Sequence, residues 1–256
     1  MIRTVDLSIG YHRGKTANAV QQGLNLLANP GELIALIGPN GCGKSTLLRT
    51  LAGLQEPLAG SVFLEEVNLE DLKLTQRAQQ ISLVLTDSVQ LGYITVEQLV
   101  AMGRHPYSTV SGKLSKNDEK QVSDALKAVH LEPFCNRLVA ELSDGERQRV
   151  MIAKALAQDT PLILLDEPTS FLDLPNRVEI LLLLKKLARD LQKCILISTH
   201  EIDLAIRLAD KLWLMDAGAV LQAGTPAELT ANDSIHHVFH GDSFGFDPET
   251  GRVIIF

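Results

Sequence analysis

Residues 38–46 constrain this chain more than any other segment. They read GPNGCGKST and fit the pattern G-x-x-x-x-G-K-[ST]. The apolar run at residues 33–37 precedes them, and leucines at helical spacing follow from Leu47 onwards. Between a strand and a helix, such glycines let backbone N–H groups turn toward phosphate oxygens, and the helix N-terminus adds positive charge. The segment therefore predicts a phosphate-binding loop; the alternative is a glycine-rich turn that binds nothing.

The side chains of this loop have separate expected roles. We expect Lys44 to neutralise charge on the β- and γ-phosphates of a nucleotide, which makes it a candidate catalytic residue. We expect the Ser45 hydroxyl to bind Mg²⁺. The residues expected to line the nucleotide here are Gly38, Pro39, Asn40, Gly41, Cys42, Gly43, Lys44, Ser45 and Thr46.

Short apolar runs alternate with helical patterns along the chain. They lie at residues 33–37, 162–165 and 195–198, and each is followed by turn residues and then by an amphipathic helical pattern. Buried strands that alternate with helices are typical of a parallel sheet covered on both faces. We therefore predict an α/β fold: a P-loop NTPase core with a parallel sheet flanked by helices.

The segment at about residues 86–150 is more polar and mostly helical, with a helix expected at residues 116–129. We predict that it forms a helical subdomain inserted into a nucleotide-binding domain of residues 1–230. Residues 231–256 are predicted to be a C-terminal tail packed on this domain. Their last apolar run, residues 253–256, is predicted to be a final strand or a packed end.

The composition disfavours several classes of protein. The net charge is −7 and the Lys and Arg residues are scattered, which disfavours a nucleic-acid partner. The three cysteines match no zinc or disulfide pattern, which favours a reducing compartment. No apolar run is as long as a signal-peptide core or a membrane span. We expect a soluble chain that works at a membrane only through a partner.

A second motif follows the apolar run at residues 162–165, where the chain continues with Asp166 and Glu167. Two carboxylates at the end of a buried strand are costly unless they have a function. With a phosphate loop upstream, we expect Asp166 to hold Mg²⁺, usually through water, and Glu167 to orient and deprotonate the attacking water. The alternative is a pair of acids that caps the next helix, since Pro168 and Thr169 follow.

Four further motifs resemble those of ATP-binding-cassette (ABC) proteins. Residues 142–149, LSDGERQR, stand ahead of the acidic strand and resemble the LSGGQ signature. Residues 170–173, SFLD, resemble the D-loop, and His200 after CILIST resembles the switch histidine. Tyr11 is similar to the aromatic residue that stacks on adenine. Taken singly, His200 could cap a helix and Tyr11 could be a core residue, but together the motifs follow the order of the family.

The ABC resemblance implies a mechanism. Two copies face head to tail, and each ATP with its Mg²⁺ lies between the phosphate loop of one copy and the signature of the other. The residues implied to contact the nucleotide across this interface are Ser143, Gly145 and Glu146. The implied catalytic residues are Glu167, His200 and Lys44. The resemblance also implies an N-terminal antiparallel β portion beside the α/β core.

Two positions depart from the family pattern. Asp144 replaces the third-position glycine of the signature and brings a negative charge close to the phosphate site. Thr86 stands where the family has its Q-loop glutamine. The Thr86 hydroxyl could bind Mg²⁺ through a water molecule, which adds it to Ser45 and Asp166 as a predicted metal ligand. In the alternative, Gln90 takes the place of the missing glutamine.

Residues 95–107, TVEQLVAMGRHPY, and residues 246–252, FDPETGR, resemble importers of ferric siderophores, haem and cobalamin. The resemblance implies an ATPase at the cytoplasmic face of the inner membrane, bound to permease subunits that work with a periplasmic or surface substrate-binding protein. The first segment would otherwise be an ordinary helical surface. An exporter, a lipoprotein-release ATPase and an iron–sulfur assembly ATPase remain the alternatives.

Three histidines lie close together near the C-terminus: His236, His237 and His240. At helical spacing, His236 and His240 would share a face, as metal ligands can. No acidic or cysteine ligand adjoins them in this run, so surface histidines are the favoured interpretation.

Overall fold

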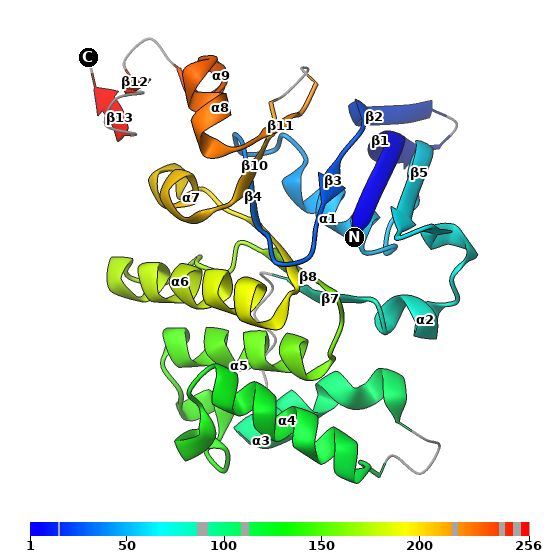
Figure 1. Cartoon of the computed structure of the whole chain (residues 1–256), viewed down its shortest axis with the longest axis vertical. Coiled ribbons are helices and arrows are strands. Elements are labelled where there is room, and N and C mark those ends of the chain that lie inside the picture. The colour runs from blue at the N-terminus through cyan, green and yellow to red at the C-terminus, as the bar shows by residue number, and fades with distance from the viewer. Residues whose placement is uncertain are drawn as a thin grey trace.

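A six-stranded sheet forms the centre of the computed structural model (Figure 1). The structure describes residues 1–14, 16–85, 92–108, 113–216, 220–240, 244–247 and 252–255. The strand order is β11–β10–β4–β9–β8–β7. In that order, the bounds are Gln222–Gly224, Lys211–Leu214, Leu33–Ile37, Cys194–Ser198, Leu162–Asp166 and Ile81–Val84. Neighbouring strands are parallel except β11, which is antiparallel to β10.

Strand β4 shows why the sheet is covered on both faces. All of its residues are buried, and successive side chains of a strand point to opposite faces. Leu33, Ala35 and Ile37 pack in one core cluster with α5 (Asp144–Ala157) and α6 (Leu174–Leu191). Ile34 and Leu36 pack in a second cluster with α1 (Lys44–Leu51). The continuous apolar run of β4 thus reflects burial on both sides.

Five strands near the N-terminus form a separate antiparallel sheet. They are β1 (Ile2–Arg13), β2 (Thr16–Leu24), β3 (Leu27–Ala28), β5 (Ala59–Leu64) and β6 (Val67–Asn68). Strand β1 pairs with β2, β3 and β5, and its Leu7 and Ile9 pack in the same cluster as α1. The predicted fold class, an α/β core with an antiparallel N-terminal portion, is confirmed.

The remaining helices are α2 (Leu74–Ala78), α3 (Val96–Ala101), α4 (Lys116–Ala128), α7 (Ile202–Leu208), α8 (Pro226–Ala231) and α9 (Ser234–Val238). Figure 1 shows α3, α4 and α5 gathered at one end of the molecule. The predicted helix at residues 116–129 is α4. Helix α6 begins earlier than its apolar pattern indicates, because Asp173 caps it and accepts from the Asn176 N–H at 3.1 Å. The division of the chain at residues 86, 150 and 230 stays a prediction.

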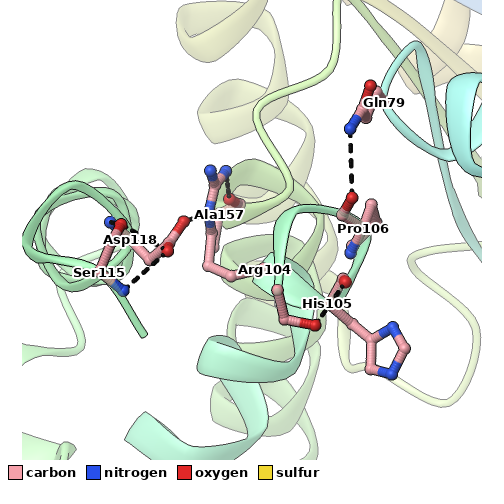
Figure 2. A network of polar contacts seen from close by, with 8 residues as sticks. Gln79, Arg104, His105, Pro106, Ser115, Asp118 and Ala157 are labelled. Atoms are coloured by element: carbon pink, nitrogen blue, oxygen red, sulfur yellow. Dashed lines mark hydrogen bonds and ion pairs between the residues drawn. The ribbon is translucent and has the colours of Figure 1, made fainter. Parts of the chain in front are cut away.

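The buried ion pair Arg104–Asp118 joins the 3₁₀ helix Met102–Tyr107 to α4 (Figure 2). Arg104 Nε lies 2.8 Å from Asp118 Oδ1 of α4, and Arg104 Nη1 donates to the Ala157 carbonyl of α5 at 2.7 Å. Asp118 Oδ2 in turn accepts from the Ser115 N–H at 2.9 Å and from its hydroxyl at 2.6 Å. On the other side, Gln79 donates to the Pro106 carbonyl at 3.1 Å. This network fixes the backbone of the importer-like segment.

Strand β10 carries the one tryptophan of the chain, Trp213. It is fully buried and pairs in register with Leu36 of β4. Its indole N–H has no hydrogen-bond partner among the described residues. Trp213 therefore sits in the core, one strand from the start of the phosphate loop.

Two short strands, β12 (Phe244–Asp247) and β13 (Arg252–Ile255), pair antiparallel near the C-terminus. Of the two alternatives for the last apolar run, the final strand is the one found. Within the described ranges, no helix combines the length and the apolar character that a membrane crossing requires.

Candidate nucleotide-binding and hydrolysis site

Close packing of the phosphate loop requires glycine at two positions. A Cβ at Gly38 would lie 2.1 Å from the Met215 carbonyl oxygen, and one at Gly43 would lie 2.4 Å from Val20 Cγ1. Gly43 also has a φ of +110°, a conformation that other residues rarely adopt, and α1 begins directly after it. The loop therefore ends with its backbone turned into a helix N-terminus, as anion binding needs.

Lys44 is buried at this turn, with 6% of its surface exposed. Its ammonium group donates to the carbonyls of Gly38 at 2.8 Å and Pro39 at 3.1 Å. Burial lowers the pKa of Lys44, while the nearby Glu167 and Asp166 carboxylates act in the opposite direction. The structure thus places the predicted lysine close to the predicted acidic pair.

Two other loop residues have contacts that the sequence does not reveal. The Cys42 side chain is buried in the core cluster of α1, and burial raises the pKa of its thiol. Any contact of Cys42 with phosphate would therefore come from its backbone. The Thr46 hydroxyl bonds to the hydroxyl of Tyr11, whose side chain remains about half exposed. Tyr11 is thus held at the loop rather than in the core, and its stacking on adenine stays a prediction.

The acidic pair lies where strand β8 ends. Asp166 is buried and in register with Ser198 of β9. The Ser198 hydroxyl donates to Asp166 Oδ1 at 2.6 Å and accepts from the Glu167 N–H at 2.9 Å. Sequence reasoning missed Ser198; the available signal was a polar residue at the end of an otherwise apolar strand.

The Glu167 carboxylate faces His200. His200 Nε2 lies 2.5 Å from Glu167 Oε1, and both side chains are partly exposed. The backbone of Glu167 is left-handed, with a φ of +49°. The alternative in which these residues cap helices receives no support, because neither α6 nor α7 is capped by their side chains. The structure therefore brings the predicted base, Glu167, together with the predicted switch histidine, His200.

The signature segment begins α5. The Ser143 hydroxyl accepts from the Glu146 N–H at 3.3 Å, and the Glu146 carboxylate accepts from the Ser143 N–H at 2.8 Å. These bonds form a capping box. The Ser143 hydroxyl, which donates to the Glu146 carboxylate at 2.7 Å, and then the Ser143 N–H lower the pKa of Glu146. A Cβ at Gly145 would lie 2.8 Å from Asn176 Oδ1 of α6, so glycine permits close helix packing here. Among the described residues, no hydrogen bond or ion pair joins residues 143–146 to the phosphate loop of the same chain.

Arg177 links the D-loop to the segment after the switch histidine. Its Nε donates to the Leu172 carbonyl at 2.6 Å, and its Nη1 forms an ion pair with Glu201. Ser170 donates to the Glu167 carbonyl at 2.8 Å. Phe171, between them, is 82% exposed with a φ of +66°. Hydrogen bonds thus hold the D-loop at Ser170 and at Leu172, and the Phe171 side chain between them is exposed.

Comparison with known proteins decides the family. The model of the family described as ABC transporter matches residues 21–170, more than half of the chain. This chain belongs to the ABC transporter family. It is 40% identical to the petrobactin import ATP-binding protein FpuD of Bacillus anthracis, over 84% of this chain and 79% of that protein. It is 36% identical to the ferric enterobactin transport ATP-binding protein FepC of Escherichia coli, over 93% and 86%.

A solved dimeric ABC transporter cassette, MJ0796, has the same fold. It superposes with a TM-score of 0.72 at 30% identity and covers 88% of this chain and 99% of that one. The ABC resemblance and the P-loop NTPase fold are therefore confirmed, and the chain is an ABC ATPase. The roles of its individual site residues stay predictions.

One departure from the ABC pattern is described by the structure and one is not. Asp144 Oδ1 lies 2.6 Å from Arg147 Nη2, three residues along α5. Its extra negative charge is thus paired within the same turn. Thr86 and the alternative Gln90 lie outside the described residues, so the predicted role of Thr86 as a metal ligand stays a prediction.

Two of the three residues predicted to hold Mg²⁺ lie in the described part of the chain, and both fit that ion. Asp166 offers a buried carboxylate at the carboxyl end of β8, and Ser45 offers a hydroxyl in the first turn of α1. Mg²⁺ prefers oxygen ligands and is usually held by one or two carboxylates together with substrate phosphates. The lack of a cluster of three or more His, Cys, Asp or Glu ligands in the described residues is compatible with such a site.

His236 and His240, near the C-terminus, do not share a helical face. Helix α9 ends at Val238, so His240 lies beyond it and that prediction is wrong. The rings of His236 and His240 nevertheless stack, with centroids 4.9 Å apart. No group of three metal ligands occurs here within the described residues, so the metal interpretation gains no support.

Proposed function

We propose that this ABC ATPase powers the import of an iron–siderophore, haem or cobalamin-type chelate through a membrane permease. Two relatives are named for petrobactin import and for ferric enterobactin transport, which supports this cargo class. The segment at residues 95–107, which resembles such importers, supports the same choice.

The observation that carries the hydrolysis mechanism is the Glu167–His200 contact beside Asp166 and Lys44. Glu167 takes the proton of the attacking water as its oxygen bonds to the γ-phosphorus, and the bond to ADP breaks. His200 holds the Glu167 carboxylate in position. Lys44 and the loop N–H groups stabilise charge on the phosphates. Ser45 and Asp166 would hold Mg²⁺, which would supply further charge neutralisation when bound.

Two copies of the chain form the working unit. The signature begins a capped helix that packs on the sheet face opposite α1, and a cassette similar to this chain is dimeric. In a head-to-tail dimer, Ser143, Gly145 and Glu146 of one copy meet the nucleotide held by the phosphate loop of the other. Tyr11 stacks on its adenine.

The permease docks at the segment from residue 86 to residue 107. Tyr93 is 96% exposed and Met102 is 52% exposed on the described part of this segment. The Arg104 network holds its backbone in place (Figure 2). A permease docked there would hold the ATPase at the cytoplasmic face of the cell membrane, with a periplasmic or surface binding protein that delivers cargo on the other side.

Replacement of the proposed base tests the mechanism. In Glu167→Gln, the amide keeps the size of the side chain and loses its basicity, so hydrolysis should fall by at least about a hundredfold. ATP binding should persist, and sedimentation with ATP and Mg²⁺ should show a heavier, trapped dimer.

Glu65→Gln is the matched control, because Glu65 is also left-handed but lies in the turn between β5 and β6. It should leave the hydrolysis rate unchanged. A wild-type rate in Glu167→Gln would remove Glu167 from the role of base.

A further inference from the structure

Ser198 ends strand β9 directly beside the acidic pair. Its side chain is fully buried, and its position is in register with Asp166. Its hydroxyl donates to Asp166 Oδ1 at 2.6 Å and accepts from the Glu167 N–H at 2.9 Å. One hydroxyl therefore contacts both residues of the pair, as donor to one and acceptor from the other.

These two bonds lie where the backbone changes conformation. Strand β8 ends at Asp166, and Glu167 adopts a φ of +49°. A non-glycine residue persists in this left-handed conformation only where surrounding contacts hold it. The Glu167 N–H finds its acceptor in Ser198 Oγ, so the hydroxyl is one of the contacts that hold the turn.

The direction of the Glu167 side chain depends on this turn. Its carboxylate lies 2.5 Å from His200 Nε2, and His200 is two residues beyond Ser198. One chain segment thus holds Glu167 twice, at its backbone through Ser198 and at its carboxylate through His200. A displacement of about 1 Å at a reacting group can lower a rate by about a hundredfold.

We propose that Ser198 is a positioning residue for ATP hydrolysis. Its hydroxyl fixes the peptide between Asp166 and Glu167, which holds the Glu167 carboxylate against His200 and one Asp166 oxygen in a constant direction. Ser198 acts through the Asp166 carboxylate and the Glu167 backbone, to which its hydroxyl is bonded. The inference rests on the proposed function, in which Glu167 is the base.

Two substitutions of nearly equal shape separate the hydroxyl from its packing. Ser198→Thr and Ser198→Val add similar bulk to the buried strand, but only the threonine can donate and accept hydrogen bonds. In Ser198→Val, kcat should fall about tenfold or more while the dissociation constant for ATP changes less than about threefold. Ser198→Thr should recover most of the lost rate.

If both Thr and Val at position 198 disturb the fold, Ser198→Ala tests the same hydroxyl without adding atoms to the buried strand. Its control is Ser82→Ala in β7. Ser82 is also a buried sheet serine, but its hydroxyl bonds to Thr160 and to the Ala155 carbonyl, away from the acidic pair. Ser198→Ala should lose kcat, and Ser82→Ala should lose only thermal stability.

The turn at Glu167 can also be monitored without an activity assay. Amide hydrogen exchange at Glu167, measured without nucleotide, should accelerate in Ser198→Val and stay slow in Ser198→Thr. In a Glu167→Gln background, Ser198→Val should cause little further loss of rate, since both changes act on one group.

The outcomes distinguish this inference from the proposed function. If Glu167→Gln abolishes hydrolysis but Ser198→Val and Ser198→Thr share one kcat and one exchange rate, only the positioning role fails. The same holds if Ser82→Ala loses as much kcat as Ser198→Ala. If Glu167→Gln hydrolyses ATP normally, the proposed function itself fails.

Discussion

Arg147 stands three residues after Asp144 on the first turn of α5 and pairs with it at 2.6 Å. Both side chains are exposed, so the pair contributes little to folding stability. Its effect is local. The Arg147 guanidinium neutralises the Asp144 carboxylate, which stands where other ABC proteins have a glycine in the signature. At the proposed dimer interface, that carboxylate would otherwise face the γ-phosphate bound by the second copy.

Arg147→Ala should therefore weaken the ATP-dependent dimer. In a Glu167→Gln background, we expect its dissociation constant to rise about three- to tenfold at low salt, because an unpaired carboxylate then faces the phosphate. The rise should shrink at high ionic strength. Asp144→Gly combined with Arg147→Ala should restore much of the affinity. Sedimentation equilibrium measures all of these, and a salt-independent loss would point to packing instead of charge.

At the scale of elements, one ion pair connects the 3₁₀ helix Met102–Tyr107 with α4 and α5 (Figure 2). Arg104 is 3% exposed and Asp118 is 6% exposed. Removal of one partner of a buried pair leaves an uncompensated charge, which is more costly than loss of the pair as a whole. The pair thus holds the proposed permease-docking segment to the helices behind it.

Asp118→Asn should lower the free energy of unfolding by about 3 kcal/mol at neutral pH. Asp124→Asn is the control on the same helix, since Asp124 forms an exposed pair with Lys120 and should give no measurable change. Urea denaturation measures both. Equal stabilities of the two variants would show that the Arg104–Asp118 pair contributes nothing.

The same pair predicts a pH dependence. Hydrogen bonds from the Ser115 side chain and backbone, and then the Arg104 guanidinium, hold the pKa of Asp118 below its ordinary value. A depressed pKa in the folded state means that this stabilisation is complete above the pKa of the unfolded chain, about 3.9, and is lost as pH falls through the folded value. The stability difference between wild type and Asp118→Asn should be constant from about pH 5 to 8 and shrink below about pH 4. A constant difference down to pH 3 would contradict this assignment.

At the scale of the whole molecule, the sequence predicted the strands that frame the proposed site better than the contacts that position its side chains. Strands β4, β8 and β9 were predictable because a strand buried on both faces appears in the sequence as a continuous apolar run. The phosphate loop was predictable because its whole motif, GPNGCGKST, lies in nine adjacent residues. Ser198 could not be assigned, since its role depends on the register between two strands more than 30 residues apart in sequence. Arg104 and Asp118 were also missed, because an ion pair between two separate helices leaves no local pattern in the sequence.

The complete transporter offers a test at this scale. Cysteines placed at Tyr93 and Met102 should crosslink to the permease, because both positions are exposed on the proposed docking segment. A Cys135→Ser background avoids the one native thiol that is partly exposed. A cysteine at Leu191, which is 46% exposed at the end of α6, is the control. Crosslinks at Leu191 alone would place the permease on another face.

The buried Trp213 gives this protein an internal optical label. Because the chain has one tryptophan, its indole fluorescence comes from one place, the apolar core beside the strand that leads into the phosphate loop. Because the indole lies in an apolar environment, its fluorescence should be blue-shifted in the native state and move to the red once water reaches it. The colour of the emitted light would then follow the opening of this one part of the sheet, with no dye attached and no residue changed.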